Sequence, residues 1–259
     1  MTAPSRIFAV VPAAGVGRRM NGNKPKQYML LNGTTVLEHS LGQLLREPRI
    51  QKIIVVVSPD DQHWKSIEIF NDARIDVVEG GKERCHSVLN GLKHLYSSLD
   101  KNITGGRGVD DSTVDGSTGD RESVWGNSRV LVHDVARPCI NLNDIQKLIV
   151  TLQHHPVGGI LAVPVVDTLK QVSEVGTIEK TIDRSHLWQA QTPQMFPFEL
   201  LLKVLSDGIE KETIFTDEAS ALEFAGYTPL VIEGSPENIK VTRPEDLALA
   251  EFYLSKRLV

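Results

Sequence analysis

Short apolar runs rich in valine and isoleucine recur along the chain, and longer segments with helical spacing of apolar residues separate most of them. Runs of this kind predict buried strands, and helical spacing predicts amphipathic helices. The predicted strands cover residues 7–11, 53–57, 75–78, 130–132, 160–166 and 230–232, and the predicted helices cover 36–45, 87–95, 142–152 and 198–205. This alternation predicts an α/β fold in which helices cover both faces of a mostly parallel sheet.

Two further helices carry start signals. Thr242 precedes Pro244 and two acidic residues ahead of an apolar helical stretch, an arrangement common at helix N-termini. Thr216 begins a similar segment that Gly226 ends. Thr216 is open to two interpretations, as part of a helix cap or as a contact to a substrate.

Two segments interrupt the alternation. Residues 97–128 are rich in glycine, serine and aspartate and hold few large apolar side chains, so we expect a mobile inserted loop. Residues 168–184 alternate apolar and polar positions around a turn at 174–177, which predicts a β-hairpin. Because two strands alone are marginally stable, we expect residues 167–186 to form an arm through which two subunits dimerise.

The composition narrows the class of protein. The 259 residues carry a formal net charge of -5, and the basic residues are scattered except near the N-terminus, which argues against a nucleic-acid-binding protein. No apolar run is long enough to span a membrane and no secretory signal begins the chain, so we expect a cytoplasmic protein. The length suits a single domain over residues 1–259. Cys85 and Cys139 lie in separate segments, where small packing residues are the expectation.

The first predicted strand leads into a glycine loop with a basic tail. The small residues Ala13, Ala14, Gly15 and Gly17 let phosphate oxygens approach the backbone N–H groups of this loop. Two arginines and two lysines follow within residues 18–26, which suits the several negative oxygens of a triphosphate. The spacing matches neither the dinucleotide fingerprint nor the P-loop. The sequence therefore predicts a nucleoside triphosphate site of another type at the carboxyl edge of the sheet.

Polar residues follow other predicted strands at the same edge. Asp134 comes just after the strand over 130–132, where a carboxylate can hold Mg²⁺ against triphosphate oxygens. An internal ion pair with Arg137 is the alternative, but the neighbouring glycine loop favours the metal role. Gly81 and Ser87 follow another strand and either contact a base or form a turn and a helix cap.

Together these motifs resemble one family. They read PAAGVGRRM with PKQY, GGKERCHSV, VLVHDVARPC, VPVVDTLK, TIDRSHLWQAQTPQMF, TDEASALE and NIKVTRPEDLALAE, in family order over nearly the whole chain. The glycine loop and HDVARP are shared by wider nucleotidyltransferases, whereas WQAQTPQ and NIKVTRPEDL are more specific. The chain resembles the 2-C-methyl-D-erythritol 4-phosphate cytidylyltransferases, the CTP-using enzymes of the non-mevalonate isoprenoid pathway. It departs from them at Lys82, where the family often has an acid, and in the length of the segment over 97–128.

The resemblance implies a Rossmann-like domain with a β-arm that joins a homodimer, Mg²⁺ as cofactor, and CTP and methylerythritol phosphate as substrates. It assigns the CTP phosphates and ribose to Ala13, Ala14, Gly15 and Gly17, and cytosine to Gly81 and Ser87. It assigns Mg²⁺ to Asp134, and transition-state stabilisation to Arg19, Lys26 and Lys240. It assigns the methylerythritol phosphate pocket to Arg137, Thr192 and Thr216, with Thr168 and Arg184 contributed by the arm of the second subunit.

Three alternatives stay open at the level of sequence. A related cytidylyltransferase for another polyol phosphate, such as ribitol 5-phosphate, would have the same nucleotide half. Transfer of a uridylyl or adenylyl group is also possible on physical grounds, because base choice depends on backbone geometry. A non-catalytic nucleotide-binding protein is a more remote alternative, because mere binding does not need the cations Lys26 and Lys240 around the reacting phosphorus.

Overall fold

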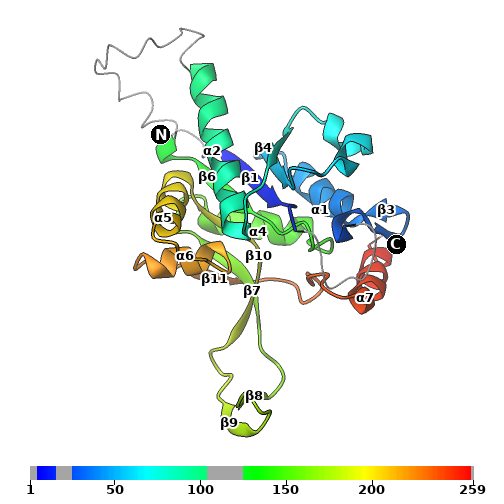
Figure 1. The fold of residues 1–259 in the computed structure, drawn as a ribbon, viewed down its shortest axis with the longest axis vertical. Helices are drawn as coiled ribbons and strands as arrows, with labels where there is room; N and C mark the ends of the chain where they lie inside the picture. Colours follow the sequence, from blue (N-terminus) through cyan, green and yellow to red (C-terminus); the bar gives the residue numbers. More distant parts are fainter. Residues whose placement is uncertain (1–4, 16–24, 104–124, 258–259) are drawn as a thin grey trace.

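The computed structural model describes residues 5–15, 25–103 and 125–257, and its centre is a sheet of seven strands (Figure 1). In spatial order these are β11 (Leu230–Glu233), β7 (Gly159–Pro164), β10 (Trp188–Pro197), β6 (Arg129–Val132), β1 (Ile7–Pro12), β4 (Ile50–Val57) and β5 (Ile75–Glu79). Every neighbouring pair is parallel except the two pairs that β10 makes with β6 and β7. The predicted α/β fold with a mostly parallel sheet is confirmed.

Helices cover both faces of this sheet, as the sequence predicts. Helices α1 (Val36–Leu45) and α4 (Leu142–Leu152) pack on one face with Ile7, Ala9 and Val11 of β1. Helices α2 (Arg84–Ile103), α5 (Phe198–Glu210) and α6 (Glu218–Phe224) pack on the other with Phe8 and Val10. The alternation along β1 therefore divides the apolar core into two layers.

A last helix, α7 (Pro244–Ser255), lies at the opposite side of the body from α5 and α6 (Figure 1). The predicted start of this helix is confirmed. The Asp246 carboxylate accepts hydrogen bonds from the backbone N–H groups of Thr242 and Arg243 just before the helix. Ala250 and Leu254 pack with Cys139 in a small separate cluster. In the described part of the chain, no helix combines the length and apolar character needed to cross a membrane.

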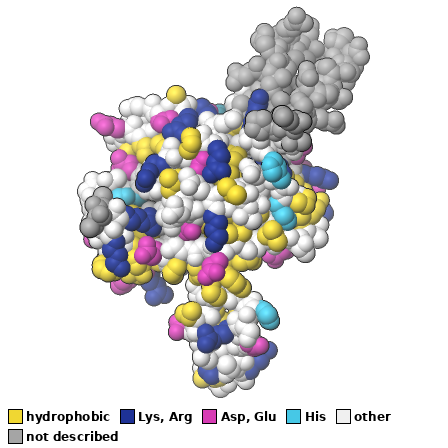
Figure 2. Space-filling view, turned by 180° about the vertical axis from the view of Figure 1, so that it is seen from behind, with side chains coloured by type: hydrophobic (Ala, Val, Ile, Leu, Met, Phe, Trp, Pro, Cys, Tyr) yellow, Lys and Arg dark blue, Asp and Glu magenta, His cyan; other side chains and the backbone are white. Residues whose placement is uncertain are grey.

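The predicted hairpin is confirmed as a separate two-stranded sheet of β8 (Leu169–Val172) and β9 (Ile178–Ile182). It projects from the body at the bottom of Figure 1, and Figure 2 shows the same arm from behind, standing clear of the body. Gly176 turns the chain between the two strands with a φ of 82°, a conformation that favours glycine. The arm residues are almost all exposed.

Small elements complete the described chain. A short hairpin consists of β2 (Leu30–Leu31) and β3 (Thr34–Thr35), and single 3₁₀ turns occur at η2 (Lys26–Tyr28), η3 (His63–Ser66) and η4 (Glu68–Asn71).

The structure differs from the sequence-based expectations in two places. The 97–128 segment is not a loop throughout, because α2 continues to Ile103 and Trp125 is buried against Phe198, with ring centroids 4.3 Å apart. Residues 104–124 lie outside the described part of the chain. Strand β10 was not predicted at all, because its polar residues interrupt the apolar pattern.

Candidate active site

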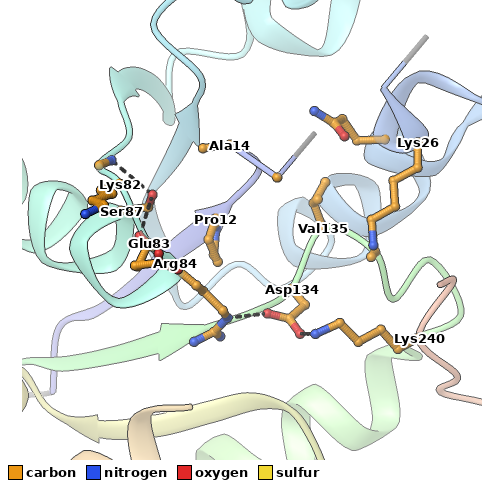
Figure 3. A pocket seen from close by; sticks show the side chains of 14 residues that line it. Pro12, Ala14, Lys26, Lys82, Glu83, Arg84, Ser87, Asp134, Val135 and Lys240 are labelled. Atoms are coloured by element: carbon orange, nitrogen blue, oxygen red, sulfur yellow. Dashed lines mark hydrogen bonds and ion pairs between the residues drawn. The ribbon is translucent and has the colours of Figure 1, made fainter. Parts of the chain in front are cut away.

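A pocket of about 420 Å³ opens at the carboxyl ends of β1, β5 and β6 (Figure 3). Its lining brings together residues that the sequence analysis took from separate motifs: Ala14, Gly15, Lys26, Gly81, Ser87, Asp134 and Lys240. We call this cavity the Asp134 pocket. A cavity is thus present at the carboxyl edge of the sheet, where the sequence predicts a site.

The start of the glycine loop is held in place because both backbone polar groups of its first residue, Ala13, are hydrogen-bonded within the protein. The N–H of Ala13 donates to the Val56 carbonyl at 2.7 Å, and the Ala13 carbonyl accepts the Gln27 side-chain amide at 2.9 Å. Ala13 is buried and does not line the pocket, whereas Ala14 and Gly15 do. Gly17 and Arg19, which were also assigned to the site, lie outside the described residues.

The loop after β5 packs directly against the glycine loop. A Cβ at Gly80 would lie 2.7 Å from the Ala14 Cβ, so only glycine permits this approach. The Ser87 hydroxyl accepts the N–H of Gly81 at 3.1 Å and donates to the Glu83 carbonyl. The turn that the sequence allows at this position is therefore present. Ser87 does not cap α2, because this helix begins at Arg84, three residues before the predicted start.

Asp134 lines the pocket and lies between two cations. Its Oδ1 accepts the Arg84 Nε at 2.9 Å, and its Oδ2 is 2.7 Å from the Lys240 Nζ, as drawn in Figure 3. Burial alone would raise the pKa of this carboxyl, but the charges of Arg84 and Lys240 outweigh that effect and hold the pKa well below its usual range. Asp134 is therefore a stable anion at the strand end.

Arg84 and Glu218 are functional candidates that the sequence analysis missed. The Arg84 guanidinium donates to both oxygens of Glu218, at 2.6 and 3.1 Å, in addition to its bond with Asp134. Burial lowers the pKa of Arg84, but these two carboxylates raise it above the ordinary value, so the guanidinium stays charged. No local sequence pattern predicts this cluster, because its residues are far apart in the sequence.

A second, smaller cavity adjoins the first. It has a volume of about 240 Å³ and is lined by Arg84, Asp134, Arg137, Thr192, Gln194, Thr216, Lys240 and their neighbours. We call it the Thr192 pocket. Arg84, Asp134 and Lys240 line both cavities and form their common wall. Three residues assigned from the resemblance to an acceptor pocket, Arg137, Thr192 and Thr216, thus meet here.

The hydroxyl of Thr192 is bound within the protein. It accepts the N–H of Asp134 at 3.0 Å and donates to the His133 Nδ1 at 3.1 Å, while the His133 Nε2 donates to the Arg137 carbonyl at 3.2 Å. Burial lowers the pKa of His133 to about 4, so its ring is neutral and fits this chain of donors. Thr192 and His133 thereby hold the backbone on either side of Asp134.

The segment around Lys240 is tied to the same loop. The N–H of Val241 donates to the Ala136 carbonyl at 2.8 Å, and the Lys26 Nζ donates to the Val241 carbonyl at 3.0 Å. The Arg137 guanidinium donates to the carbonyl of Asn238 at 2.7 Å. Lys26 and Lys240 therefore both line the pocket although they are far apart in the sequence, and hydrogen bonds through Val241 connect their segments.

Thr216 does not cap α6; Asp217 does, through the N–H of Ser220 at 2.9 Å. The amide of Gln194 in β10 binds the Asp217 carboxylate and the N–H of Ala219, which fixes this helix beside the Thr192 pocket. Thr168 and Arg184 do not line either pocket of this chain. They lie exposed at the base of the arm, where Arg184 donates to the Val165 and Val166 carbonyls.

Comparison with known proteins identifies a family of nucleotidyltransferases to which the whole chain is similar. The family model of the 2-C-methyl-D-erythritol 4-phosphate cytidylyltransferases matches residues 7–103 and 101–256. The protein of that name from Aliivibrio fischeri is 45% identical over 256 residues, covering 99% of this chain and 97% of the relative. The one from Vibrio parahaemolyticus is 46% identical over 252 residues, covering 97% of both.

Solved structures give the same result. The crystal structure of 2-C-methyl-D-erythritol 4-phosphate cytidylyltransferase from Francisella tularensis is 33% identical, has a TM-score of 0.73, and is matched over 96% of this chain and 100% of that one. A crystal structure of 4-diphosphocytidyl-2C-methyl-D-erythritol synthase is 35% identical with a TM-score of 0.75, over 96% and 99%. The chain belongs to the 2-C-methyl-D-erythritol 4-phosphate cytidylyltransferase family of nucleotidyltransferases.

Proposed function

We propose that the protein joins CTP to 2-C-methyl-D-erythritol 4-phosphate, giving 4-diphosphocytidyl-2-C-methylerythritol and pyrophosphate for isoprenoid precursor synthesis. Family membership supports the two substrates. The observation that carries the chemistry is the common wall of Arg84, Asp134 and Lys240 between two adjoining pockets. CTP occupies the Asp134 pocket, and the acceptor phosphate occupies the Thr192 pocket.

The reaction needs charge neutralisation more than proton transfer. The attacking group is an oxygen of the acceptor phosphate, which is already an anion at neutral pH. It bonds to the α-phosphorus of CTP as the bond from that phosphorus to the pyrophosphate oxygen breaks. Bringing two polyanions together is the main barrier, so preorganised cations such as Lys26 and Lys240 are the expected catalytic groups, together with Arg19.

The residues of the Asp134 pocket fit Mg²⁺. The ion is commonly held by one or two carboxylates while substrate phosphates and water fill its other positions. Among the described residues there is no cluster of three or more metal-ligating side chains, so Asp134 would be the protein's own ligand. The bound ion would neutralise charge on the CTP phosphates. Backbone of Ala14, Gly15 and Gly17 would hold the phosphates and ribose, and Gly81 and Ser87 the cytosine. Ala13 is left out of this set, because its N–H is bound to Val56 and its carbonyl to Gln27.

The acceptor pocket would be completed by a second subunit. We assign Arg137 and Thr216 to contacts with the acceptor, and Thr192 to the wall of its pocket, because the Thr192 hydroxyl is bound to Asp134 and His133. Thr168 and Arg184 from the arm of another copy would join them. The arm exposes apolar side chains that would be covered in a dimer: Val172 at 53%, Val175 at 87% and Ile178 at 61%. Light scattering should give the mass of a dimer, and a monomer mass would contradict this part of the proposal. The proposed place of action is the cytoplasm.

The deciding experiment is pyrophosphate release with CTP and Mg²⁺, with methylerythritol 4-phosphate or ribitol 5-phosphate as acceptor. Release with the first acceptor alone supports the proposal. Release with ribitol 5-phosphate alone would keep the nucleotide site and overturn the acceptor. UTP and ATP in place of CTP test base choice in the same assay, and no release with any pair would favour a binding protein.

A further inference from the structure

Glu218 is a buried carboxylate without a role in the proposed reaction. It begins α6, is 1% exposed and lines neither pocket. An isolated buried charge is costly, and here the Arg84 guanidinium satisfies it through two hydrogen bonds of 2.6 and 3.1 Å. The pair therefore connects α6 to the first residue of α2, and that residue, Arg84, also contacts Asp134.

The geometry restricts how Arg84 can approach Asp134. Both terminal nitrogens of Arg84 bind Glu218, so its Nε makes the contact with Asp134, at Oδ1 alone. A guanidinium without such a restraint favours two parallel bonds to both oxygens of a carboxylate. The Oδ2 of Asp134 is left to Lys240, whose side chain is 41% exposed and ends a flexible stem.

We propose that Glu218 is a positioning residue that confines Arg84 to one oxygen of Asp134 and keeps the other oxygen exchangeable between Lys240 and Mg²⁺. This inference rests on the proposed Mg²⁺ role of Asp134. Without the Glu218 charge, the guanidinium is free to take both oxygens. Mg²⁺ then has to displace a bidentate ion pair rather than a single lysine.

The test is the Mg²⁺ dependence of CTP binding, measured by calorimetry without acceptor, so that the readout does not depend on turnover. Glu218→Gln preserves size and a hydrogen-bond acceptor but removes the charge. We expect it to raise the half-saturating Mg²⁺ concentration by about tenfold, the lower end of the effect of removing residues that orient metal ligands. CTP binding without Mg²⁺ should change much less.

Glu47 supplies the matched control. It is also 1% exposed and holds Arg49 through two bonds, at 2.6 and 2.9 Å, but lines neither pocket. Glu47→Gln therefore removes the same kind of pair and should leave the Mg²⁺ requirement unchanged. Equal Mg²⁺ requirements in the Glu218 and Glu47 variants would overturn the inference.

Two further variants make the outcome decisive. If Glu218→Gln does not fold, Glu218→Asp keeps the charge but shortens the reach, and it should raise the Mg²⁺ requirement by a few-fold; an unchanged value again overturns the inference. Asp134→Asn separates this inference from the proposed function. An effect of Asp134→Asn without one at Glu218 rejects the positioning role alone, whereas no effect at Asp134 rejects the metal role on which it rests.

Discussion

The basic side chains around Asp134 differ in how firmly each is held. Arg84 is fixed by two carboxylates and is 23% exposed, whereas Lys240 makes one ion pair and is 41% exposed. The Lys26 ammonium donates to the carbonyl of Val241. A cation placed before substrate arrives needs no reorganisation when charge develops, which makes Lys26 a strong candidate for stabilising the transition state.

Lys26→Ala should therefore lower kcat by about a hundredfold or more, the scale of losing one preorganised donor. The measurement is the steady-state rate of pyrophosphate release. Lys147→Ala is a matched control, because the Lys147 Nζ also donates to a distant backbone carbonyl, that of Glu233 at 2.7 Å, but lines neither pocket. Similar rates in both variants would remove Lys26 from the catalytic groups.

At the residue scale, the sequence indicates which residues line the pocket where their position depends on a neighbouring element. Asp134 follows its strand directly, so strand polarity alone places it at the pocket. The Arg84–Glu218 pair joins residues 134 positions apart, and no periodicity or motif connects them. Thr192 shows a second limit of prediction from sequence. Its hydroxyl is bound to the backbone N–H of Asp134 and to His133. The sequence cannot display which of a threonine's contacts are internal.

At the element scale, α2 has to approach the sheet closely to bring Arg84 to Asp134. A Cβ at Gly91 would lie 2.8 Å from the Val10 Cγ1 and 3.1 Å from the Val56 Cγ2, both in the sheet. Both valines are stiff, β-branched side chains, so neither yields easily. Gly91 is therefore the residue that sets the distance between this helix and β1.

Gly91→Ala should lower the free energy of unfolding by about 1–3 kcal/mol, the usual cost of overpacking a core. Gly42 in α1 offers the opposite case, because its added Cβ would meet nothing within 4 Å. Gly42→Ala should raise that free energy by roughly 0.5–1 kcal/mol, since glycine is unfavourable inside a helix. Urea unfolding of both variants measures the difference, and shifts of the same sign would contradict this account of α2 packing.

The stability of the folded protein should fall at alkaline pH because of Cys139, which packs against α7. This thiol is fully buried, its Sγ donates to the carbonyl of Ala250 in α7, and burial raises its pKa from 9.0 to about 11. Between these values the unfolded chain loses the thiol proton while the folded protein keeps it. The contribution to stability is therefore complete below pH 9 and is lost as pH rises towards 11.

Two pKa units correspond to about 3 kcal/mol across that range. Cys139→Ala should show a correspondingly smaller loss of unfolding free energy between pH 9 and 11 than the natural protein. Chemical denaturation at several pH values measures both slopes. Parallel pH profiles would show that ionisation of this thiol is not linked to folding.

The elements that the sequence predicts differ from strand β10, which it does not predict, in where their polar residues point. Helices α1 and α4 have the predicted bounds because their apolar residues face one layer of the core. Strand β10 is buried over much of its length but carries Gln191 and Gln194, whose side-chain amides bind a loop carbonyl and the cap of α6. Such a strand lacks the apolar pattern of a buried strand, so only the tertiary structure reveals it.

At the scale of the whole molecule, the arm and the two pockets lie apart within one chain. Figure 1 shows the arm leading away from the body, and neither pocket includes Thr168 or Arg184. If these residues serve the acceptor, as proposed, they have to do so in another copy. Each active site would then contain a body from one chain and an arm from the other.

Mixing two variants, each impaired in a different part of the proposed site, tests this arrangement directly. One subunit carries Lys26→Ala with an intact arm, and the other carries Arg184→Ala with an intact body. In a mixed dimer with exchanged arms, one of the two sites regains both residues. After subunit exchange, equal mixing should restore roughly a quarter of the natural activity, because half of the dimers are mixed and each has one complete site.

The control for this experiment is a mixture in which no complete site can form. Arg184→Ala subunits combined with subunits carrying both Lys26→Ala and Arg184→Ala should regain no activity under either arrangement. If the arm instead served its own subunit, the first mixture would also stay inactive, since every site would lack either Lys26 or Arg184. Recovery in the first mixture alone therefore requires that the arm acts across the dimer, and that the two substrates meet at a site built from two chains.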